Sequence, residues 1–263
     1  YQEQINKLKK EFKDVLAKDN DPPGRTNAAT LSINTGESAP IKQKSYRYPP
    51  EKREFIEKEI ATLLQQGIIS ESNSPWSSPI VVVPKPGGGL RMCVDFRAVN
   101  DVTVKDTYPL PQIKDILENM IGAKVFSKLD LHKAFHQIYI DPKDREKTAF
   151  ITNKSLYEYN LMPFGLANAP SVFQRCMDKV LMKLNWFCCL VYIDDIIIYS
   201  KSIPEHIEHL RQVFTALRKA NLKARESKCI FFQTELKFLG HIINEKGHTP
   251  DPEKVAAIVE FER

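Results

Sequence analysis

The sequence predicts an α+β fold. Apolar residues recur at helical spacing in several separate segments, and short apolar runs of strand length lie between these segments. Helices and strands do not follow the regular strand–helix–strand order that a parallel α/β sheet requires. With 263 residues, the chain is long enough for one large or two ordinary domains.

The N-terminal part is expected to be a helix followed by an extended arm. Apolar side chains at helical spacing predict a helix over residues 3–17, and a segment rich in Pro, Gly, Asn, Ser and Thr follows at 19–50. Pro49-Pro50 then opens a helix over 51–66, for which Gly67 is a natural stop.

A hairpin with a basic, glycine-rich tip is expected next. A loop at 74–79 leads into a short strand at 80–83, and a Pro/Gly-rich turn at 84–89 leads into a return strand at 90–96. Later segments continue the mixture of helices and strands. Helices are expected at 111–121, 132–137, 169–184 and 207–217 and from near Asp251, and strands at 125–131, 138–140, 148–151, 229–232 and 237–243.

Bulk composition limits the class of protein. The net charge of +5, from 38 Lys and Arg against 33 Asp and Glu, permits a polyanionic partner without requiring one. The apolar stretches are too short to span a membrane, and the N-terminus has no signal-peptide character. Five scattered cysteines do not form a disulfide framework. An intracellular protein with no membrane contact is therefore expected.

Two adjacent carboxylates, Asp194 and Asp195, interrupt the strand-like run 190–200. Burying such a pair is costly unless a cation compensates it. Two interpretations stay open: the pair lies at a hairpin tip in water, although it lacks the glycine that such turns favour, or it binds a metal ion. Asp130, which also lies in strand-like sequence, is the best third acid for a Mg²⁺ site that performs phosphoryl transfer.

Basic side chains outside this segment have two readings each. Lys85 and Arg91 flank the glycine-rich tip, where they are either phosphate ligands or part of a solvated turn. His206 and His209 are three positions apart, as two metal ligands on a helix are, but their charged neighbours favour a solvated helix face.

Tyr192-Ile193-Asp194-Asp195 is accompanied by seven further motifs in a fixed order. They are Ser-Pro-Trp-Ser-Ser-Pro (74–79), Arg-Met-Cys-Val-Asp-Phe-Arg (91–97), Tyr-Pro-Leu-Pro (108–111), Phe-Ser-Lys-Leu-Asp-Leu (126–131), Lys-Thr-Ala-Phe (147–150), Pro-Phe-Gly-Leu-Ala-Asn-Ala-Pro (163–170) and Phe-Leu-Gly-His (238–241). In this order they resemble the reverse transcriptases of gypsy-type long-terminal-repeat retroelements, over roughly residues 30–263.

The resemblance implies a right-hand polymerase whose palm is an antiparallel sheet with flanking helices and whose thumb is largely missing. The implied parts are an N-terminal helix and arm at 1–50, fingers at 51–105 and 138–167, palm at 106–137 and 168–245, and the start of a thumb or connection at 246–263.

The resemblance also implies an RNA-directed DNA polymerase that adds deoxynucleotides to a primer 3′ end. Asp130, Asp194 and Asp195, with the Leu131 carbonyl, would hold two Mg²⁺ ions, for which Mn²⁺ is a substitute. The implied partners are an RNA or DNA template, a DNA or tRNA primer, deoxynucleoside triphosphates and further polyprotein domains such as ribonuclease H. The implied location is the cytoplasm, including virus-like particles.

Further residues receive roles only through the resemblance. Lys85 and Arg91 would grip the triphosphate, although the tip reads Lys-Pro-Gly-Gly where many relatives have Lys-Lys-Asp-Gly. Phe135 would exclude a 2′-hydroxyl by steric contact, or it is a plain core aromatic. The remaining implied contacts are Phe164 and Gly165 in the same pocket, Tyr192 at the primer end, Leu239-Gly240-His241 as a primer grip, and Arg97 on the template or in an ion pair with Asp95.

One alternative function stays open, a catalytically inactive nucleic-acid-binding or assembly module that keeps this fold. The truncated thumb favours it, because thumb contacts hold a duplex in place. The presence of all three acids and of the finger cations opposes it.

Overall fold

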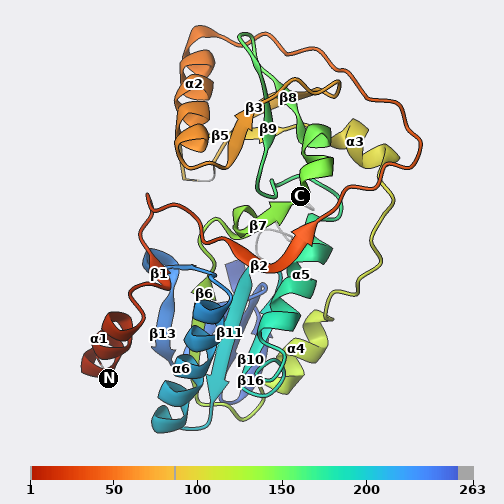
Figure 1. Ribbon diagram of the computed structural model, residues 1–263. Helices are drawn as coiled ribbons and strands as arrows, with labels where there is room; N and C mark the ends of the chain where they lie inside the picture. Colours follow the sequence, from red (N-terminus) through yellow and green to blue (C-terminus); the bar gives the residue numbers. More distant parts are fainter. Residues whose placement is uncertain (1, 86, 254–263) are drawn as a thin grey trace, which may run out of the picture. The chain divides into compact units, whose positions relative to one another are not determined.

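The computed structural model describes residues 2–85 and 87–253, which form two compact units interleaved in sequence (Figure 1). Unit 1 takes in the described residues of 1–23, 109–132 and 174–263, and unit 2 comprises 24–108 and 133–173. Both units mix helices with sheets, which confirms the α+β class. The implied boundaries of fingers, palm and thumb stay predictions.

The central sheet of unit 1 has four strands in the order β10-β11-β6-β13, and all neighbouring pairs are antiparallel. Its strands are rich in Val, Ile and Leu, which suit a buried pleated surface. Helix α6 (Ile203–Lys219) packs on β11 and β6 (Figure 1). The strands are β6 (Val125–Asp130), β10 (Cys189–Tyr192), β11 (Asp195–Ser200) and β13 (Ile230–Gln233).

Shorter elements complete unit 1. The pair β1–β12 is parallel, and β14, β15 and β16 form an antiparallel sheet of three strands. Their bounds are α1 (Gln2–Glu11), β1 (Leu16–Ala17), α4 (Ile113–Asn119), β12 (Ala224–Arg225), η3 (Glu226–Lys228), β14 (Glu235–Phe238), β15 (His241–Asn244) and β16 (Gly247–Pro250).

Two expectations for unit 1 were wrong in detail, and a third is not tested by the described residues. The first helix ends at Glu11 because Leu16 and Ala17 pair as a strand with Ala224 and Arg225. The single strand expected at 237–243 is two strands joined by a turn, in which Leu239 and Gly240 have φ values of 47° and 78°. The helix expected from near Asp251 lies mostly outside the described residues.

The main sheet of unit 2 has five strands in the order β3-β9-β8-β4-β5. The expected basic hairpin is confirmed as β4 and β5, and the helix expected at 51–66 is confirmed as α2. The bounds are α2 (Pro50–Gln65), β3 (Ile69–Glu71), β4 (Ser78–Pro84), β5 (Leu90–Val94), α3 (Arg97–Val102), η1 (Ala134–Gln137), η2 (Pro142–Thr148), β8 (Phe150–Ile151) and β9 (Leu156–Tyr159).

The N-terminal arm is more ordered than the sequence indicated. Within it, β2 (Thr26–Leu31) pairs in parallel with β7 (Ile138–Ile140), so backbone hydrogen bonds hold a segment that lacks a strong strand pattern. Strands β3 and β9 were likewise not expected from the sequence. Residues before Phe150 form the 3₁₀ helix η2, which shortens the strand expected at 148–151.

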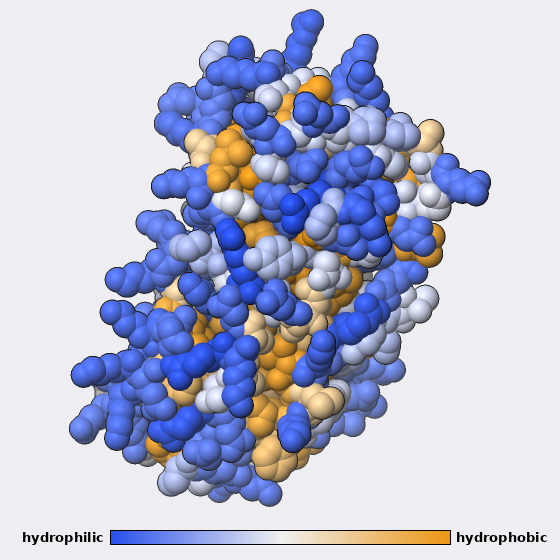
Figure 2. Space-filling view, in the orientation of Figure 1, coloured by the Kyte–Doolittle hydropathy of each residue, from blue (hydrophilic) through white to orange (hydrophobic). Residues whose placement is uncertain are grey.

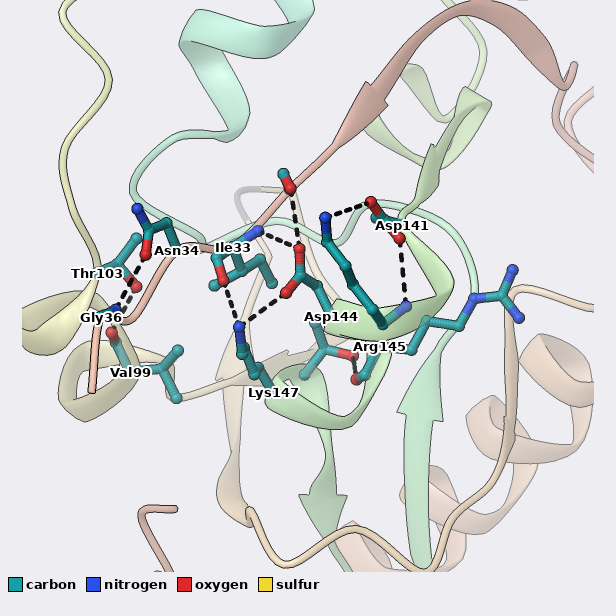
Figure 3. A network of polar contacts seen from close by, with 12 residues as sticks. Ile33, Asn34, Gly36, Val99, Thr103, Asp141, Asp144, Arg145 and Lys147 are labelled. Atoms are coloured by element: carbon teal, nitrogen blue, oxygen red, sulfur yellow. Dashed lines mark hydrogen bonds and ion pairs between the residues drawn. The ribbon is translucent and has the colours of Figure 1, made fainter. Parts of the chain in front are cut away.

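A buried carboxylate fastens the arm to η2 (Figure 3). Asp144 is only 3% exposed, and its carboxylate accepts hydrogen bonds from the backbone N–H of Ile33 at 2.8 Å and from Lys147 Nζ at 2.7 Å. Burial acts to raise the pKa of Asp144, but these bonds and one from Ser32 outweigh it, so the pKa is lowered. The arm therefore depends on an ionised side chain.

Apolar side chains fill the space around the central sheet of unit 1. One core cluster joins α4, the sheet and β14, and its members include Ile116, Phe126, Leu190, Ile197 and Phe238. The face shown in Figure 2 is mostly hydrophilic, with separate apolar patches. Among the described residues, no helix combines the length and apolarity that crossing a bilayer needs.

Candidate active site

Asp130 and Asp195 lie directly opposite each other on neighbouring antiparallel strands. Asp130 is the last residue of β6 and Asp195 the first of β11, and they are Cα partners in the ladder. Side chains in such a position have Cβ atoms about 4.5–5.5 Å apart. The sheet register therefore brings together the two sequence segments whose meeting the spacing alone did not establish.

Asp194 lies in the two-residue loop Ile193-Asp194 that joins β10 to β11. Ile193 has a left-handed φ of 56°, which costs a residue with a Cβ about 1–2 kcal/mol. The pair of acids thus occupies a hairpin tip, as one interpretation of the sequence required. The same tip faces Asp130, so the two interpretations are compatible.

The surroundings of Asp194 disfavour its ionised form. Although the side chain is exposed, partial desolvation by neighbouring protein atoms is the largest cause that raises its pKa. The negative charges of Asp195 and Asp130 raise the pKa further, while a backbone hydrogen bond and Lys128 lower it. A positive charge placed among these three carboxylates would relieve the repulsion.

Two lysines supply part of that positive charge. Lys128 Nζ lies 2.8 Å from Asp195 Oδ1, and Lys228 Nζ lies 3.6 Å from Asp130 Oδ2. Sequence reasoning missed both. Lys128 could have been identified from the sequence, because side chains of a strand alternate between its two faces. Lys128 is two residues before Asp130 and therefore lies on the same face of β6. The position of Lys228 beside Asp130 is visible only in the tertiary structure.

The residue types of the donor set suit a hard divalent cation, although the three side chains as they lie do not form a ready metal site. Three carboxylates provide the oxygen ligands that Mg²⁺ prefers, and Leu131 is buried beside Asp130 at an isolated bridge with Ala224. Among residues 2–85 and 87–253, no group of three His, Cys, Asp or Glu side chains stands ready to hold a metal ion. In the structure, Asp195 pairs with Lys128 and Asp130 pairs with Lys228.

Lys85 and Arg91 flank the tip of the β4–β5 hairpin, as expected. Arg91 pairs across the ladder with Val83, and the N–H of Lys85 donates to the Gly89 carbonyl at 3.0 Å, which closes the turn. Both side chains are exposed, and within the described part of the chain neither forms an ion pair. They are thus available to an anionic ligand or to water.

Phe135 belongs to a cluster of aromatic rings in unit 2. Its centroid lies 4.8 Å from that of Phe164 and 5.5 Å from that of Phe173. Phe135 itself is 8% exposed, whereas Phe164 is 54% exposed, so Phe164 forms the outer edge of the cluster. The packing of Phe135 is that of a core aromatic, and its exclusion of a 2′-hydroxyl stays a prediction.

Gly165 follows Phe164 with a φ of 94°, a conformation that favours glycine. A Cβ there would lie 3.5 Å from Phe96 and 3.6 Å from the Val94 carbonyl, which is ordinary contact, so backbone conformation is the stricter constraint. Asn100 Nδ2 donates to the Gly165 carbonyl at 2.8 Å and fixes this loop. Sequence reasoning did not single out Asn100.

Arg97 forms the ion pair that the sequence left as an alternative to template contact. Its Nε and a terminal nitrogen donate to the two carboxylate oxygens of Asp95 at 2.9 and 2.6 Å. The side-chain hydrogen bond from Arg97 lowers the pKa of Asp95. The guanidinium remains largely exposed, so this pair does not prevent contact with a phosphate.

The residues implied at the primer lie on two hairpins of unit 1. Tyr192 ends β10 and, with Leu239, packs against the core cluster as a partly buried side chain. Gly240 and His241 stand at the β14–β15 turn, where the Gly240 carbonyl accepts a hydrogen bond from the Asp251 N–H at 3.0 Å. The positive φ values of this turn explain a glycine here.

The solvated helix face expected around His206 and His209 was wrong. His206 has no exposed surface and His209 is 7% exposed. Ser200 Oγ lies 2.8 Å from Nδ1 of His206 and 2.7 Å from Nδ1 of His209, and Ser127 Oγ lies 2.7 Å from Nε2 of His206. The histidines thus form a buried polar network between α6 and the sheet. Charged neighbours in sequence misled the prediction because they occupy other positions around the helix.

Comparison with known proteins gives consistent matches. Residues 83–243 match the family model described as reverse transcriptase (RNA-dependent DNA polymerase). Two Drosophila melanogaster proteins, the retrovirus-related Pol polyproteins from transposons 297 and gypsy, are 42% and 39% identical to this chain. These alignments cover 99% and 97% of this chain but 25% and 26% of the relatives, so the chain spans about a quarter of their length.

A solved structure of the foamy viral protease-reverse transcriptase in complex with RNA/DNA hybrid has the same fold. Its TM-score is 0.88 at 28% sequence identity, and the match covers 98% of this chain and 34% of that chain. A second structure of the foamy viral enzyme, in complex with double-stranded DNA, matches with a TM-score of 0.89 at 28% identity, over 98% of this chain and 45% of that one.

Proposed function

The chain belongs to the reverse transcriptase (RNA-dependent DNA polymerase) family, and we propose that it extends a primer 3′ end with deoxynucleotides copied from an RNA or DNA template. The observation that carries the proposal is the opposition of Asp130 and Asp195 across β6 and β11, with Asp194 beside them. Like charges directly opposite in a sheet are destabilising, so their presence favours a functional role over a structural one.

Reverse transcriptases generally use divalent metal ions. We assign Asp130, Asp194 and Asp195, with the Leu131 carbonyl, as the residues that would hold two Mg²⁺ ions, and Mn²⁺ as a substitute. Such ions, when bound, make the primer hydroxyl a stronger nucleophile and stabilise charge on the phosphates. The protein supplies the fixed strand ends that keep the three carboxylates together. The positive charges of Lys128 and Lys228 reduce the repulsion between these carboxylates.

Substrate contacts are assigned to unit 2. The exposed cations Lys85 and Arg91 suit the outgoing phosphates. The Arg91 guanidinium can donate two hydrogen bonds to one phosphate, and the Lys85 ammonium acts as a point charge. Phe135, with Phe164 and Gly165, would contact the sugar and leave no room for a 2′-hydroxyl. In unit 1, Tyr192 and the turn Leu239-Gly240-His241 would contact the primer. Arg97 is assigned to the template backbone.

The relatives are described as polyproteins, so we propose that this chain works beside further domains, a ribonuclease H among them. The proposed primers are DNA or tRNA. The proposed location is the cytoplasm, including virus-like particles.

Primer extension with and without metal tests the proposal. The wild-type chain should extend a DNA primer on RNA and DNA templates with Mg²⁺ or Mn²⁺ and stop when a chelator is added. Asp194→Asn should lose about three orders of magnitude or more of rate, since it removes a metal ligand. The pKa of Asp194 is raised, so its ionised form destabilises the fold above that pKa, and the Asn variant should be at least as stable as the wild type at neutral pH.

Asp115→Asn is a matched control, because Asp115 is an exposed acid of α4 in the same unit. It should extend primers at the wild-type rate. Extension by Asp194→Asn at the wild-type rate would contradict the assigned metal site. A wild-type chain that binds primer–template but extends it under no metal condition would instead be the inactive binding module.

A further inference from the structure

Gln174 is a fully buried polar residue behind the tip that carries Asp194. It lies in α5 (Ala169–Val180), and its side chain has no exposed surface. The backbone N–H of Ile193 donates to Gln174 Oε1 at 2.8 Å, and Gln174 Nε2 donates to the Val191 carbonyl at 3.3 Å. One side chain therefore fastens both the end of β10 and the loop that follows it.

The fastened loop is strained. Ile193 is the first of the two loop residues and has a left-handed φ of 56°. Two-residue hairpin loops require a positive φ at this position, and glycine is its usual occupant. A β-branched residue in this conformation is an outlier that persists only where surrounding contacts hold it. The hydrogen bond from the Ile193 N–H to Gln174 is such a contact.

A further contact fixes which way the Gln174 amide points. Gln174 Nε2 also donates to Asp178 Oδ1 at 3.1 Å, and the same Asp178 oxygen accepts from Asn185 Nδ2 at 2.9 Å. The amide nitrogen thus faces two acceptors, Asp178 and the Val191 carbonyl. In this orientation the amide oxygen faces the Ile193 N–H, which is the donor among the three partners of the Gln174 side chain.

We propose that Gln174 is a positioning residue that holds the Ile193-Asp194 loop in its left-handed conformation and so sets where Asp194 and Asp195 lie. Its hydrogen bonds reach the backbone of Val191 and Ile193, so it acts on the two carboxylates through the backbone of the loop. This role rests on the proposed polymerase function, since positioning matters only if the carboxylates do the chemistry. A plain core residue would instead affect stability without a specific effect on the loop.

Hydrogen exchange on the metal-free wild-type chain is the first test. The amide of Ile193 stands at a hairpin tip, where amides ordinarily exchange freely. If Gln174 holds it, the Ile193 amide should exchange within about tenfold of the amides of β11. Exchange at the rate of an unstructured amide would overturn the proposal. This test needs no variant and no polymerase activity.

A double-mutant cycle is the second test. Gln174→Met keeps an unbranched side chain of similar length but makes no such hydrogen bonds, and Ile193→Gly takes a positive φ without steric cost. Gln174→Met alone should speed exchange of the Ile193 amide and lower kcat, each by about tenfold, with KM for the deoxynucleotide within about twofold. In the Ile193→Gly background, the same substitution should lower kcat by less than about threefold.

Gln212→Met is the matched control, because Gln212 is a glutamine of α6 that donates to Glu208 at 3.1 Å, away from the hairpin. It should leave kcat unchanged. An equal loss of kcat in both Ile193 and Ile193→Gly backgrounds would make Gln174 an ordinary core residue. A protected Ile193 amide in a chain that extends no primer would remove the polymerase function and leave the loop contact in place.

Discussion

Lys128 Nζ lies 2.8 Å from Asp195 Oδ1, on the strand next to it. Both side chains are less than a third exposed, and the ammonium also lies 5.8 Å from the centre of the Phe238 ring. Lys128 therefore occupies a partly desolvated position beside the same carboxylates that are assigned to divalent cations. A charge here both stabilises the metal-free protein and competes with metal.

Replacing Lys128 separates these two effects. Lys128→Met keeps an unbranched side chain of similar length but removes the charge and, with it, the cation–π contact with Phe238. Without metal, the free energy of unfolding should fall by about 1 kcal/mol, because Asp130 and Asp195 then repel each other. The affinity for Mg²⁺, measured by calorimetry, should rise by about fivefold, since a competing cation is gone.

Lys124→Met is the control for Lys128→Met, because Lys124 pairs with Glu245 at 2.9 Å outside the site. It should leave Mg²⁺ affinity unchanged. Weaker Mg²⁺ binding by Lys128→Met would mean that Lys128 supports the metal site instead of competing with it.

Phe135→Val tests the proposed sugar selection. The smaller side chain should admit a 2′-hydroxyl and raise the ratio of kcat/KM for ribonucleotides over deoxynucleotides by about tenfold or more. Phe173→Leu is the control, since Phe173 contacts Phe135 in the same cluster but is fully buried. A similar change in both variants would attribute the effect to loosened packing. An unchanged ratio in Phe135→Val would leave Phe135 as a core aromatic.

The sequence predicted the elements that carry strong local patterns. Helix α2 begins at a proline and ends two residues before Gly67, which has a φ of 64°. The hairpins around 84–89 and 193–194 follow apolar strand runs. Strand β2 was missed because its sequence, Thr-Asn-Ala-Ala-Thr-Leu, has little strand pattern and takes its pairing from β7. Such partners lie far away in sequence, so propensity does not reveal them.

Some residues of the candidate site could likewise be recognised in the sequence, and others only in the structure. Adjacent acids in an apolar run are visible as an anomaly in sequence, which is how Asp194 and Asp195 were found. Lys228 was missed because only tertiary structure brings it to Asp130. Gln174 did carry a signal, as a polar residue on the otherwise apolar face of an amphipathic helix, beside Val172, Phe173 and Met177.

Lys147→Met should destabilise unit 2 strongly. It would leave the carboxylate of Asp144 buried without its cationic partner, which costs about 3–5 kcal/mol. The free energy of unfolding in urea at neutral pH measures this loss. Lys143→Met is the control, because Lys143 forms an exposed ion pair with Asp141 at 3.2 Å and should change stability by less than about 1 kcal/mol. Equal losses in the two variants would contradict the role given to Asp144.

Acid should weaken the same contact. The pKa of Asp144 is lowered in the folded chain, so its contribution is present above the unfolded value of about 3.9 and is lost as the pH falls through the folded pKa. Asp144→Asn should remove this part of the acid sensitivity. A wild-type profile in Asp144→Asn below pH ~4 would place the sensitivity elsewhere.

The buried histidine network predicts a second pH dependence at milder acidity. Burial lowers the pKa of His206 to about 3, with a smaller contribution from His209, so the folded chain holds His206 neutral. The unfolded chain protonates it near pH ~6.5. Between these values the unfolded state binds more protons, so stability rises with pH across this window and falls on acidification. From pH 7 to pH 5, His206 alone should cost about 2 kcal/mol.

Urea unfolding between pH 5 and pH 7 measures the slope that His206 contributes. His206→Gln should reduce the slope of unfolding free energy against pH by the amount that corresponds to about one bound proton, because the titrating group is gone. This holds whatever the effect of the substitution on stability at pH 7. His248→Gln removes an exposed histidine and should keep the wild-type slope. His136, whose pKa burial lowers to about 4, adds a parallel dependence that survives in His206→Gln. A slope unchanged by His206→Gln would mean that the network admits a proton without loss of folding free energy.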